Sequence, residues 1–533
     1  MKNKVLYISS ESSLGGASQS LCDMLTYIKE YIHPIVVVPA KGDLENRLAH
    51  MHVKTYLIPL SRGFGEIGQH TLEDEERDFV VNYRAALEIK DIIEKESVEL
   101  VHINSSVCNA GAMGAILTDV PYVWHLREIM EEHFGCEFWD ADLKRSLFKR
   151  TDKFIAISGC VQTAYRDRHA IVSQIIYDGI DAGRYVQAIQ RKEMDSHSFI
   201  LAGNISEAKG QIDAIRAVAI LVKEGISNIR LHIVGGYSAR FAWGLKRYVN
   251  KYGLEENIIL HCFMSDLSEL RRKCAYAIVS SKFEALGRVT VEAMMAGNIV
   301  IGVNTGGTIE LIGEDKERGY IYTQGSPDSL AEAMLEAIQE GENRKRKIRE
   351  QAQAFALSNF DTKEYAINIC NVYKEILGQK KAKDSNINFQ QYLINRYTQH
   401  MESGVTTENK LSDKGKIVSE MEKEIEENEN GIKSFLNSMN INSVAIYGMG
   451  RIGCKLYDML EHLKFKIPYV IDRDSYLISE VIEVLNPEDN VREVDALIIT
   501  VVEDSDRLKM KYDKTDRIRK IFEIGELIEK CRK

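Results

Sequence analysis

Short apolar runs alternate with longer amphipathic stretches along the first 330 residues of the chain. The runs are apolar throughout rather than at every second position, which is typical of strands buried on both faces of a parallel sheet. The amphipathic stretches between them predict helices that cover both faces of such a sheet. The first series of predicted strands comprises residues 4–9, 34–39, 53–59, 99–104, 122–126 and 153–158.

A second series of predicted strands follows a polar stretch without apolar runs at residues 189–198. We interpret that stretch as a linker, and therefore predict two doubly wound α/β domains, residues 1–190 and 191–360. The strands of the second series are residues 198–203, 229–235, 257–263, 276–281 and 298–303.

The pattern changes at residues 380–440, which are polar and include the acidic segment 421–431. We interpret this stretch as a solvated helix or a linker. A strand-helix-strand pattern starts again at residues 443–448 and continues to the end. We therefore predict a third, smaller Rossmann-like domain at residues 441–533, which we expect to fold independently and to be dispensable for the activity of the first two.

Composition narrows the classes of protein that fit. A chain of 533 residues is too long for one hydrophobic core and fits three domains. The net charge of −10 argues against a general nucleic-acid-binding protein. The nine cysteines include no CxxC pair, which disfavours a zinc cluster and fits a reducing compartment.

The chain shows neither a signal-peptide pattern at its start nor an apolar run of about 18 residues, so we expect a cytoplasmic protein. A peripheral contact with the inner face of the membrane stays open, because residues 142–154 predict a basic amphipathic helix. Alternatively, this helix packs its apolar side on the sheet. Its basic residues are Lys144, Arg145, Lys149 and Arg150, and its apolar ones are Leu143, Leu147 and Phe148.

The strongest chemical signal is segment 281–312, in which seven residues separate Glu284 from Glu292. The segment follows a predicted strand, passes Gly287, forms a helix and a further strand, and ends in the turn NTGGT. Ligands of α/β sheets bind at the carboxyl ends of the strands, where glycine-rich turns and helix N-termini offer free N–H groups to phosphates. Carboxylates accept hydrogen bonds from sugar hydroxyls. The alternative is that both glutamates are solvent-facing, but the surrounding pattern favours a binding site.

This segment resembles the E-x7-E signature of the family 4 retaining glycosyltransferases, the group 1 glycosyl transferases of the GT-B fold, and the resemblance extends over residues 1–378. It implies two Rossmann-like domains that face a cleft. It also implies that Glu284 faces the donor sugar and that Glu292 holds the nucleotide ribose. The N–H groups of Ala285, Leu286 and Gly287 would then lie near the diphosphate and the sugar.

A second match to the family is LAGNISEAKGQ, residues 201–211. Lys209 matches a lysine that binds the donor diphosphate. Asn204 stands where the family often has an arginine, and a neutral amide cannot replace its charged donors. Arg288 would supply part of the missing charge. The alternative for Lys209 is an exposed lysine at the start of a helix.

The third and fourth matches lie in the first domain. Gly15 and Gly16 form the GGA turn after the first strand, where glycine permits positive φ and a close approach of the backbone, and the next helix is expected to start near Ala17. His125 matches a histidine that reaches the donor sugar, although a lone histidine is more often structural. Arg127 is a further candidate for contact with the diphosphate or the acceptor. Helix 360–378 matches the family's last helix, which crosses back onto the first domain.

The C-terminal domain carries its own fingerprint. Gly448, Gly450 and Gly453 form GxGxxG after a strand, and Asp472 ends the next strand. This order predicts a dinucleotide site, although such appended domains either bind a nucleotide or retain only the fold. Two DxD triplets, 140–142 and 472–474, do not lie where a metal-dependent glycosyltransferase would place them, so we predict no catalytic metal.

The resemblance as a whole implies a metal-independent glycosyltransferase that acts with retention of configuration and requires no cofactor besides its donor. A UDP-sugar is the donor that the family favours, the acceptor is a saccharide or a lipid-linked sugar, and the expected role is bacterial surface polysaccharide synthesis. Two alternatives remain. One is an epimerase or a phosphorylase on the same fold, and the other is a non-catalytic sugar-nucleotide-binding protein, which the loss of arginine at Asn204 favours.

Overall fold

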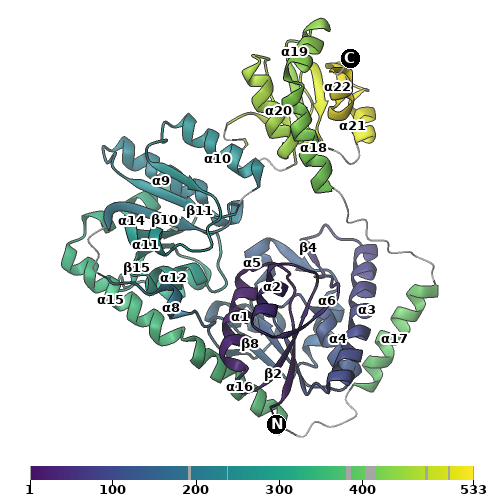
Figure 1. Ribbon diagram of the computed structural model, residues 1–533, viewed down its shortest axis with the longest axis vertical. Helices are drawn as coiled ribbons and strands as arrows, with labels where there is room; N and C mark the ends of the chain where they lie inside the picture. The colour runs from purple at the N-terminus through teal and green to yellow at the C-terminus, as the bar shows by residue number, and fades with distance from the viewer. Residues whose placement is uncertain are drawn as a thin grey trace. The chain divides into compact units, whose positions relative to one another are not determined.

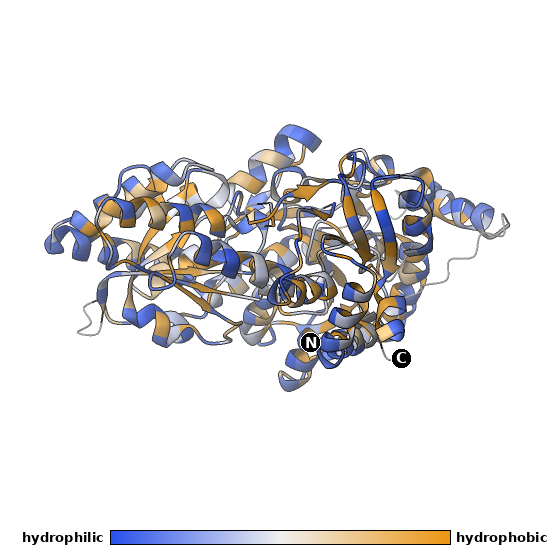
Figure 2. Ribbon diagram, turned by 90° about the horizontal axis from the view of Figure 1, so that it is seen from above, coloured by the Kyte–Doolittle hydropathy of each residue, from blue (hydrophilic) through white to orange (hydrophobic). Residues whose placement is uncertain are grey.

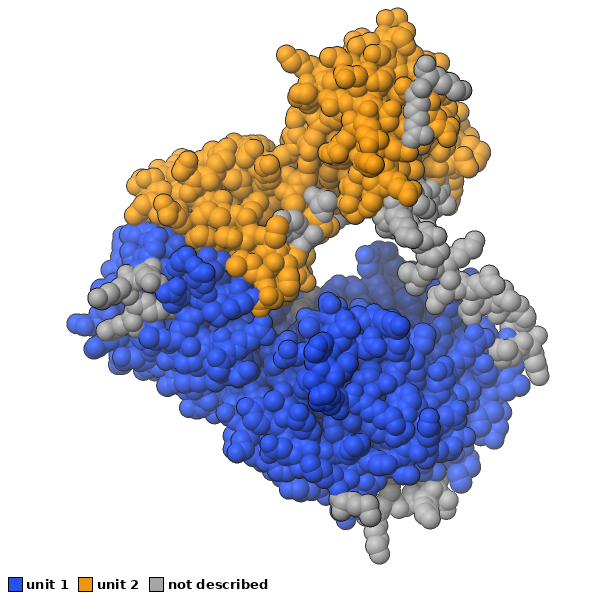
Figure 3. Space-filling view, in the orientation of Figure 1, with its two compact units in different colours: residues 1–202, 266–408 blue, residues 203–265, 409–533 orange. Residues whose placement is uncertain are grey.

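The computed structural model describes residues 2–189, 194–236, 238–379, 386–402, 414–473, 478–479, 481–501 and 505–531. The chain forms two compact units (Figure 3). Unit 1 contains residues 1–202 and 266–408, and unit 2 contains residues 203–265 and 409–533.

The first sheet of unit 1, of which β2 and β8 are labelled in Figure 1, has seven parallel strands in the order β3-β2-β1-β5-β6-β8-β9. In register, Val5 of β1 lies opposite both Pro34 of β2 and Leu100 of β5. The six strands predicted from the first apolar series are confirmed. The strands are β1 (Lys4–Ile8), β2 (His33–Val38), β3 (Lys54–Leu57), β5 (Leu100–Ile103), β6 (Tyr122–Leu126), β8 (Lys153–Ala156) and β9 (Gln174–Ile175).

Helices connect these strands, and their ends follow from local sequence. Helix α3 begins after Thr71, whose side chain forms a reciprocal capping box with Asp74, and ends at Ser97, which has a φ of +55°. The helices are α1 (Gly16–Ile28), α2 (Asp43–His50), α3 (Leu72–Glu96), α4 (Asn109–Leu117), α5 (Met130–Phe134), α6 (Ala141–Phe148), α7 (Gly159–His169) and α8 (Ala182–Tyr185). A short antiparallel pair, β4 (Phe64–Glu66) and β7 (Cys136–Phe138), is separate from the main sheet.

Unit 1 also contains the parallel strands β10 (Asp195–Ala202), β13 (Cys274–Val279), β14 (Ile299–Val303) and β15 (Gly319–Tyr322), paired in that order. Strands β10, β13 and β14 confirm the second predicted series, and β15 was not predicted. The accompanying helices are α11 (Ser268–Lys273), α12 (Arg288–Met295), α13 (Gly306–Ile312), α14 (Pro327–Gln339) and α15 (Glu342–Asn359).

Helix α16 (Thr362–Gly378) returns to the first sheet, as the resemblance implied. It packs on α1 and contributes Tyr365, Ile369 and Tyr373 to the core that surrounds Val5 and Tyr7. The Tyr373 hydroxyl lies 2.9 Å from the Tyr7 hydroxyl and 2.7 Å from Nδ1 of His102. Buried polar groups of this kind fix one packing arrangement because each must find its partner.

The stretch 380–440, which we expected to be a linker or a solvated helix, contains three helices among its described residues: α17 (Ile387–Glu402), α18 (Lys414–Glu427) and α19 (Glu429–Ser438). Helix α17 packs on α3 in unit 1. Its Arg396 donates to Glu76 and Asp140 and stacks over the Phe79 ring at 4.2 Å. Polar helices can therefore be held to a surface by ion pairs where apolar patterning is weak.

In unit 2, strand β11 (Arg230–Val234) pairs in parallel with β12 (Ile258–His261), and the short helix η1 (Glu207–Lys209), α9 (Gln211–Lys223) and α10 (Ala239–Lys251) belong to the same part of the chain. The C-terminal sheet has the order β18-β17-β16-β19-β20. Its elements are β16 (Val444–Tyr447), α20 (Arg451–His462), β17 (Val470–Ile471), β18 (Val484–Leu485), β19 (Val494–Ile499), α21 (Ser505–Tyr512), β20 (Ile518–Glu523) and α22 (Ile524–Cys531).

Hydrophobic residues concentrate on the strands and on the helix faces that cover them (Figure 2). Helix α6 follows this rule, which removes the basis for a membrane contact there: Leu143, Leu147 and Phe148 are at most 5% exposed. Lys144 is buried as well, donates to Ser106 O and Asn109 Oδ1, and has its pKa lowered to about 7 by burial. Among the described residues, no helix is both long enough and apolar enough to span a bilayer.

Candidate functional site

The loop between β13 and α12 carries the first glutamate of the E-x7-E segment. Glu284, Ala285 and Leu286 are only 9%, 3% and 3% exposed, and Gly287 is the N-cap residue before α12, with a φ of +89°, a conformation that favours glycine. The Ala285 carbonyl accepts hydrogen bonds from Ser158 Oγ at 2.5 Å and from Cys160 Sγ at 3.1 Å. The loop is thus held rigidly in place, with the N-terminus of α12 at its end.

The turn NTGGT packs directly against this loop. Gly306 has a φ of +57°, and a Cβ there would lie 2.4 Å from the Glu284 carbonyl oxygen. A Cβ at Gly307 would lie 2.5 Å from the Leu286 carbonyl oxygen, and the Gly307 N–H donates to the Glu284 carbonyl at 2.7 Å. Both glycines are therefore required for two backbones to approach within contact distance.

Glu292 lies on α12, five residues after Gly287, and is not solvent-facing. Its Oε2 lies 2.9 Å from a guanidinium nitrogen of Arg271, whose side chain is 2% exposed, while that of Glu292 is 14% exposed. Burial, followed by the charge of Glu292, raises the pKa of the nearby Tyr185 to about 12. Arg271, on α11, was not singled out by the sequence pattern.

Gly16 lies beside Arg288. Neither glycine uses the positive φ that glycine permits: Gly15 is extended with a φ of −77°, and α1 begins at Gly16. A Cβ at Gly15 would lie 2.6 Å from the end of the Glu11 side chain, whereas one at Gly16 would make an ordinary contact of 3.9 Å with Cδ of Arg288.

Arg288 joins the two sheets of unit 1. It starts α12, donates from one nitrogen to Asp23 Oδ2 on α1 at 2.8 Å, and donates from the other to the Gly179 carbonyl at 3.3 Å. The side chains of Arg288 and Asp23 are 12% and 10% exposed. An arginine expected to meet a diphosphate is therefore paired with a carboxylate, which carries the same sign of charge as a diphosphate.

His125, on β6, is fully buried. Its Nδ1 lies 3.2 Å from Nε2 of His102, while its own Nε2 is buried without a hydrogen-bond partner in the described part of the chain. Burial lowers the pKa of His125 well below its ordinary value, and the charge of Arg127 acts in the same direction. The imidazole is therefore neutral at neutral pH, and can orient a partner but not act as a cation.

Arg127 is paired with groups of the protein itself in this arrangement, so its proposed contact with a ligand stays a prediction. One guanidinium nitrogen lies 2.7 Å from each carboxylate oxygen of Asp178, and the other donates to the Tyr365 hydroxyl at 3.1 Å. The side chains of Arg127 and Asp178 are each 3% exposed. Burial opposes its charge, but Asp178 outweighs burial, so the pKa of Arg127 is raised.

Glu310, which the sequence pattern did not single out, contacts the N-terminus of α7 next to the Glu284–Gly287 loop. Its carboxylate accepts from the N–H groups of Gly159 and Cys160 at 3.0–3.3 Å, at the N-terminus of α7, and from the Tyr177 hydroxyl at 2.6 Å. This contact joins α13 to α7 beside the Ala285 carbonyl. No local signal identifies it, because its partners lie more than 130 residues away in sequence.

Asn204 and Lys209 belong to unit 2. Lys209 ends the short helix η1, and Asn204 is exposed, with its carbonyl accepting from Gln211 Nε2 at 3.0 Å. That they act together with Glu284, Glu292 and Arg288 of unit 1 stays a prediction.

The C-terminal fingerprint has the geometry that its glycines predict. Gly448 has a φ of +91°, a Cβ at Gly453 would lie 2.0 Å from the Gly448 carbonyl oxygen, and a Cβ at Gly450 would meet no atom within 4 Å. Asp472, however, already accepts hydrogen bonds from other residues of the protein. Its Oδ2 accepts from the Met449 N–H at 2.5 Å, and its Oδ1 accepts from Arg240 at 3.0 Å.

The carboxylates of the first DxD triplet form a helix cap and ion pairs within the protein. Asp140 caps α6 through the Leu143 N–H at 2.8 Å and pairs with Arg396, and Asp142 pairs with Arg145. In the second triplet, Asp474 lies outside the described residues. Within the described ranges, no group of three or more His, Cys, Asp or Glu side chains could hold a metal ion.

Comparisons with known proteins point to one class. Residues 186–355 match the family described as Glycosyl transferases group 1. The uncharacterized glycosyltransferase MJ1178 of Methanocaldococcus jannaschii is 24% identical over 295 residues, which cover 54% of this chain and 78% of that protein.

Solved structures show the same fold. Anabaena Alr3699/HepE in complex with UDP and glucose matches with a TM-score of 0.57 and 22% identity, over 70% of this chain and 99% of that chain. Its complex with UDP-glucose matches with a TM-score of 0.56 and 21% identity, over the same shares. The chain therefore has the α/β fold of GT-B glycosyltransferases, and its residues 186–355 are similar to the Glycosyl transferases group 1 family.

Proposed function

We propose that this chain is a retaining, metal-independent glycosyltransferase that moves a sugar from a nucleotide-sugar donor, most simply a UDP-sugar, to a saccharide or lipid-linked acceptor. The observation that carries the proposal is the convergence of three glycine-containing motifs. The turn at Gly306 and Gly307 packs on the Glu284–Leu286 backbone, Gly287 is the N-cap residue of α12, and Gly16 lies beside Arg288. Such a cluster of close backbones and a helix N-terminus suits a diphosphate.

Two comparisons with known proteins support a nucleotide sugar as the donor. Residues 186–355 are similar to a glycosyl transferase family, and the similar Anabaena protein has been crystallised with UDP and with UDP-glucose. By the resemblance stated above, Glu292 would accept from the ribose, and Glu284 would face the donor sugar. Synthesis of a bacterial surface polysaccharide is the role we propose for such a transferase.

The chemistry proposed for the site is stabilisation of the leaving diphosphate. Arg288 and the N–H groups at the start of α12 would neutralise the charge that grows on the leaving oxygen, and Lys209 would add a second cation. Asp23 must release Arg288 for this contact to form. His125 is neutral, so we assign it to hydrogen bonding with the sugar through Nε2, which lacks a partner in the described residues.

Acceptor-dependent release of free nucleotide tests this proposal. The full chain is incubated with UDP-, GDP- and TDP-sugars, with and without a panel of saccharide acceptors, and the released nucleotide and the anomeric configuration of the product are measured. We expect release that depends on acceptor, with the donor configuration retained. Conversion of donor without acceptor would indicate an epimerase, phosphate-dependent release a phosphorylase, and donor binding without turnover a non-catalytic binding protein.

A further inference from the structure

Helix α10 packs its side chains into the C-terminal domain of unit 2. Trp243 is 9% exposed and belongs to the same hydrophobic core as Ile452 and Leu456 of α20. Its ring meets the Tyr457 ring edge-on, with centroids 5.1 Å apart, and its Nε1 donates to Asp458 Oδ1 at 2.7 Å. A buried tryptophan with a satisfied N–H is the kind of anchor that dominates interfaces.

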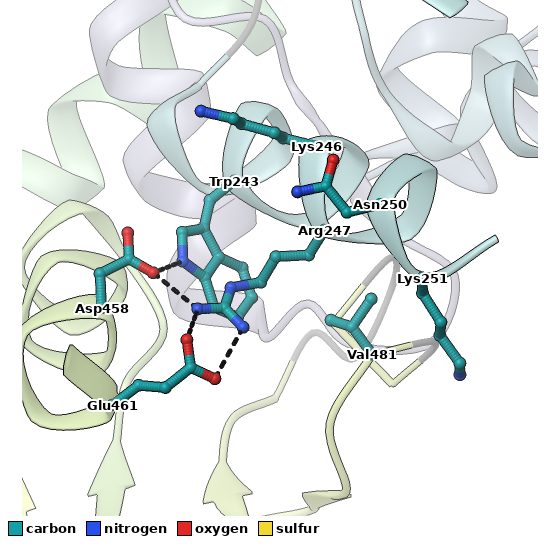
Figure 4. A pocket seen from close by; sticks show the side chains of 8 residues that line it. All are labelled: Trp243, Lys246, Arg247, Asn250, Lys251, Asp458, Glu461 and Val481. Atoms are coloured by element: carbon teal, nitrogen blue, oxygen red, sulfur yellow. Dashed lines mark hydrogen bonds and ion pairs between the residues drawn. The ribbon is translucent and has the colours of Figure 1, made fainter. Parts of the chain in front are cut away.

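Arg247, one turn further along α10, makes the most contacts across this interface (Figure 4). Its guanidinium lies 4.7 Å from the centroids of both the Trp243 and the Tyr457 rings. It donates to Asp458 at 2.9 Å and to both carboxylate oxygens of Glu461 at 3.1 and 2.5 Å. The hydrogen bond from Arg247 lowers the pKa of Glu461. Stacking and a two-point ion pair together favour one geometry for the interface.

Arg240 extends the same face of α10, because residues spaced by three and seven lie on one side of a helix. It donates to Asp472, the acidic residue of the GxGxxG fingerprint. Asp472 also accepts from Met449 within the fingerprint loop. The carboxylate expected to face a nucleotide ribose therefore faces α10 instead.

The N-terminal end of α10, which carries Arg240, lies next to the loop that contains Asn204 and Lys209. Strand β11 ends at Val234, Gly235 and Gly236 follow it, and Ser238 caps α10. A Cβ at Gly235 would lie 1.9 Å from the Gly203 carbonyl oxygen, and Ile205 N–H donates to the Gly236 carbonyl at 2.9 Å. A shift of α10 must therefore move or strain loop 203–210.

We propose that the C-terminal domain is a docked regulator of this loop: the face formed by α20 and Asp472 binds α10 of the same chain and thereby fixes loop 203–210. This differs from the expectation that residues 441–533 fold independently and are dispensable for transfer. The part of the inference that concerns donor binding rests on the proposed function, because it assumes that Lys209 contacts the donor diphosphate.

The test uses two charge reversals on α10 in the full chain. Arg247→Glu places a carboxylate against Asp458 and Glu461. Lys246→Glu makes the same charge change at the neighbouring exposed position, whose side chain is joined to neither carboxylate by an interaction in Figure 4. Hydrogen exchange is measured for α10, α20 and loop 203–210, and UDP affinity is measured by calorimetry. The double variant Arg247→Glu/Glu461→Arg restores opposite charges and controls for misfolding.

We expect Arg247→Glu, but not Lys246→Glu, to speed exchange in α10, α20 and loop 203–210 and to weaken UDP binding about 5-fold or more, the lower range of allosteric coupling. The double variant should recover most of both effects. Unchanged exchange in α10 and α20 would overturn the docking, and faster exchange there with an unchanged loop would overturn the coupling. Failure of the wild-type chain to bind UDP would refute the proposed donor alone, because the exchange measurements still decide the docking.

Discussion

Asp178→Asn is the change that most sharply separates a structural role for Arg127 from a ligand-binding one. Asparagine has nearly the same shape as aspartate, so the substitution removes the charge and leaves the packing intact. Arg127 and Asp178 are each 3% exposed, and one guanidinium nitrogen lies 2.7 Å from both carboxylate oxygens. Removing one partner of a buried ion pair costs about 3–5 kcal/mol, because the remaining charge is left uncompensated.

A loss of that size is a large share of the roughly 5–15 kcal/mol that holds a folded protein together. Urea unfolding, followed by the emission of the fully buried Trp124 in unit 1, measures it. The matched control is Asp167→Asn, which makes the same chemical change in an ion pair with Arg166 whose two side chains are each 59% exposed. The control should unfold like the wild-type chain. If Asp178→Asn is no less stable than Asp167→Asn, Arg127 is not held by Asp178, and its role as a ligand contact returns.

Three further predictions follow from the same geometry. Gly306→Ala should destabilise unit 1 by about 1–3 kcal/mol, because its φ is +57° and the new Cβ would lie 2.4 Å from the Glu284 carbonyl. Gly68→Ala, at a φ of +72° with no atom within 4 Å of the new Cβ, is the control for backbone strain alone. Equal melting temperatures for the two variants would contradict the close packing at Gly306. Lys209→Ala should lower turnover more than stability, and a variant that unfolds while the folded fraction keeps normal activity would show the lysine to be structural. Burial lowers the pKa of Lys144 to about 7 in the folded chain, so the unfolded chain binds more protons between pH 7 and about 10.4. The free energy of unfolding must therefore rise with pH across that window. Lys144→Met should remove this rise, and an unchanged slope in pH-dependent unfolding would contradict the prediction.

The strands were predictable because most are continuous buried apolar runs, as in Tyr122–Leu126, where every residue is buried. Strand β15 was missed although three of its four residues are buried, whereas two other missed strands lack that signal. Strand β9 consists of two exposed residues, and β18 of two half-buried ones. Helices α17 to α19 were left open between helix and linker because their composition is polar, and α17 is held to unit 1 by contacts such as those of Arg396, which are visible only in three dimensions.

The candidate site, like the fold, was predictable from the sequence only in part. Glycines whose backbones must approach another chain segment, such as Gly306 and Gly307, were found from the motif. The partners of its charged residues were not found, because Asp23, Arg271 and Glu310 reach their contacts from distant elements. The turn at Gly15 and Gly16 was found from the motif, but its backbone conformation, without a positive φ at either glycine, was not specified by the sequence. Charge pairing depends on tertiary geometry, which residue spacing alone does not determine.

The central claim is that the segment between Glu284 and Glu292 binds a nucleotide-sugar donor, and calorimetric titration of UDP into the full chain tests it most directly. The variant Glu292→Gln removes the charge but keeps an acceptor for Arg271, and Glu332→Gln makes the same change at an exposed position of α14. We predict saturable binding to the wild-type and Glu332→Gln chains. Glu292→Gln should weaken binding by about 1–3 kcal/mol, with each 1.4 kcal/mol equal to about ten-fold. Equal affinity of all three folded chains would contradict the assignment of Glu292, and absence of binding to UDP, GDP and TDP alike would contradict the account as a whole.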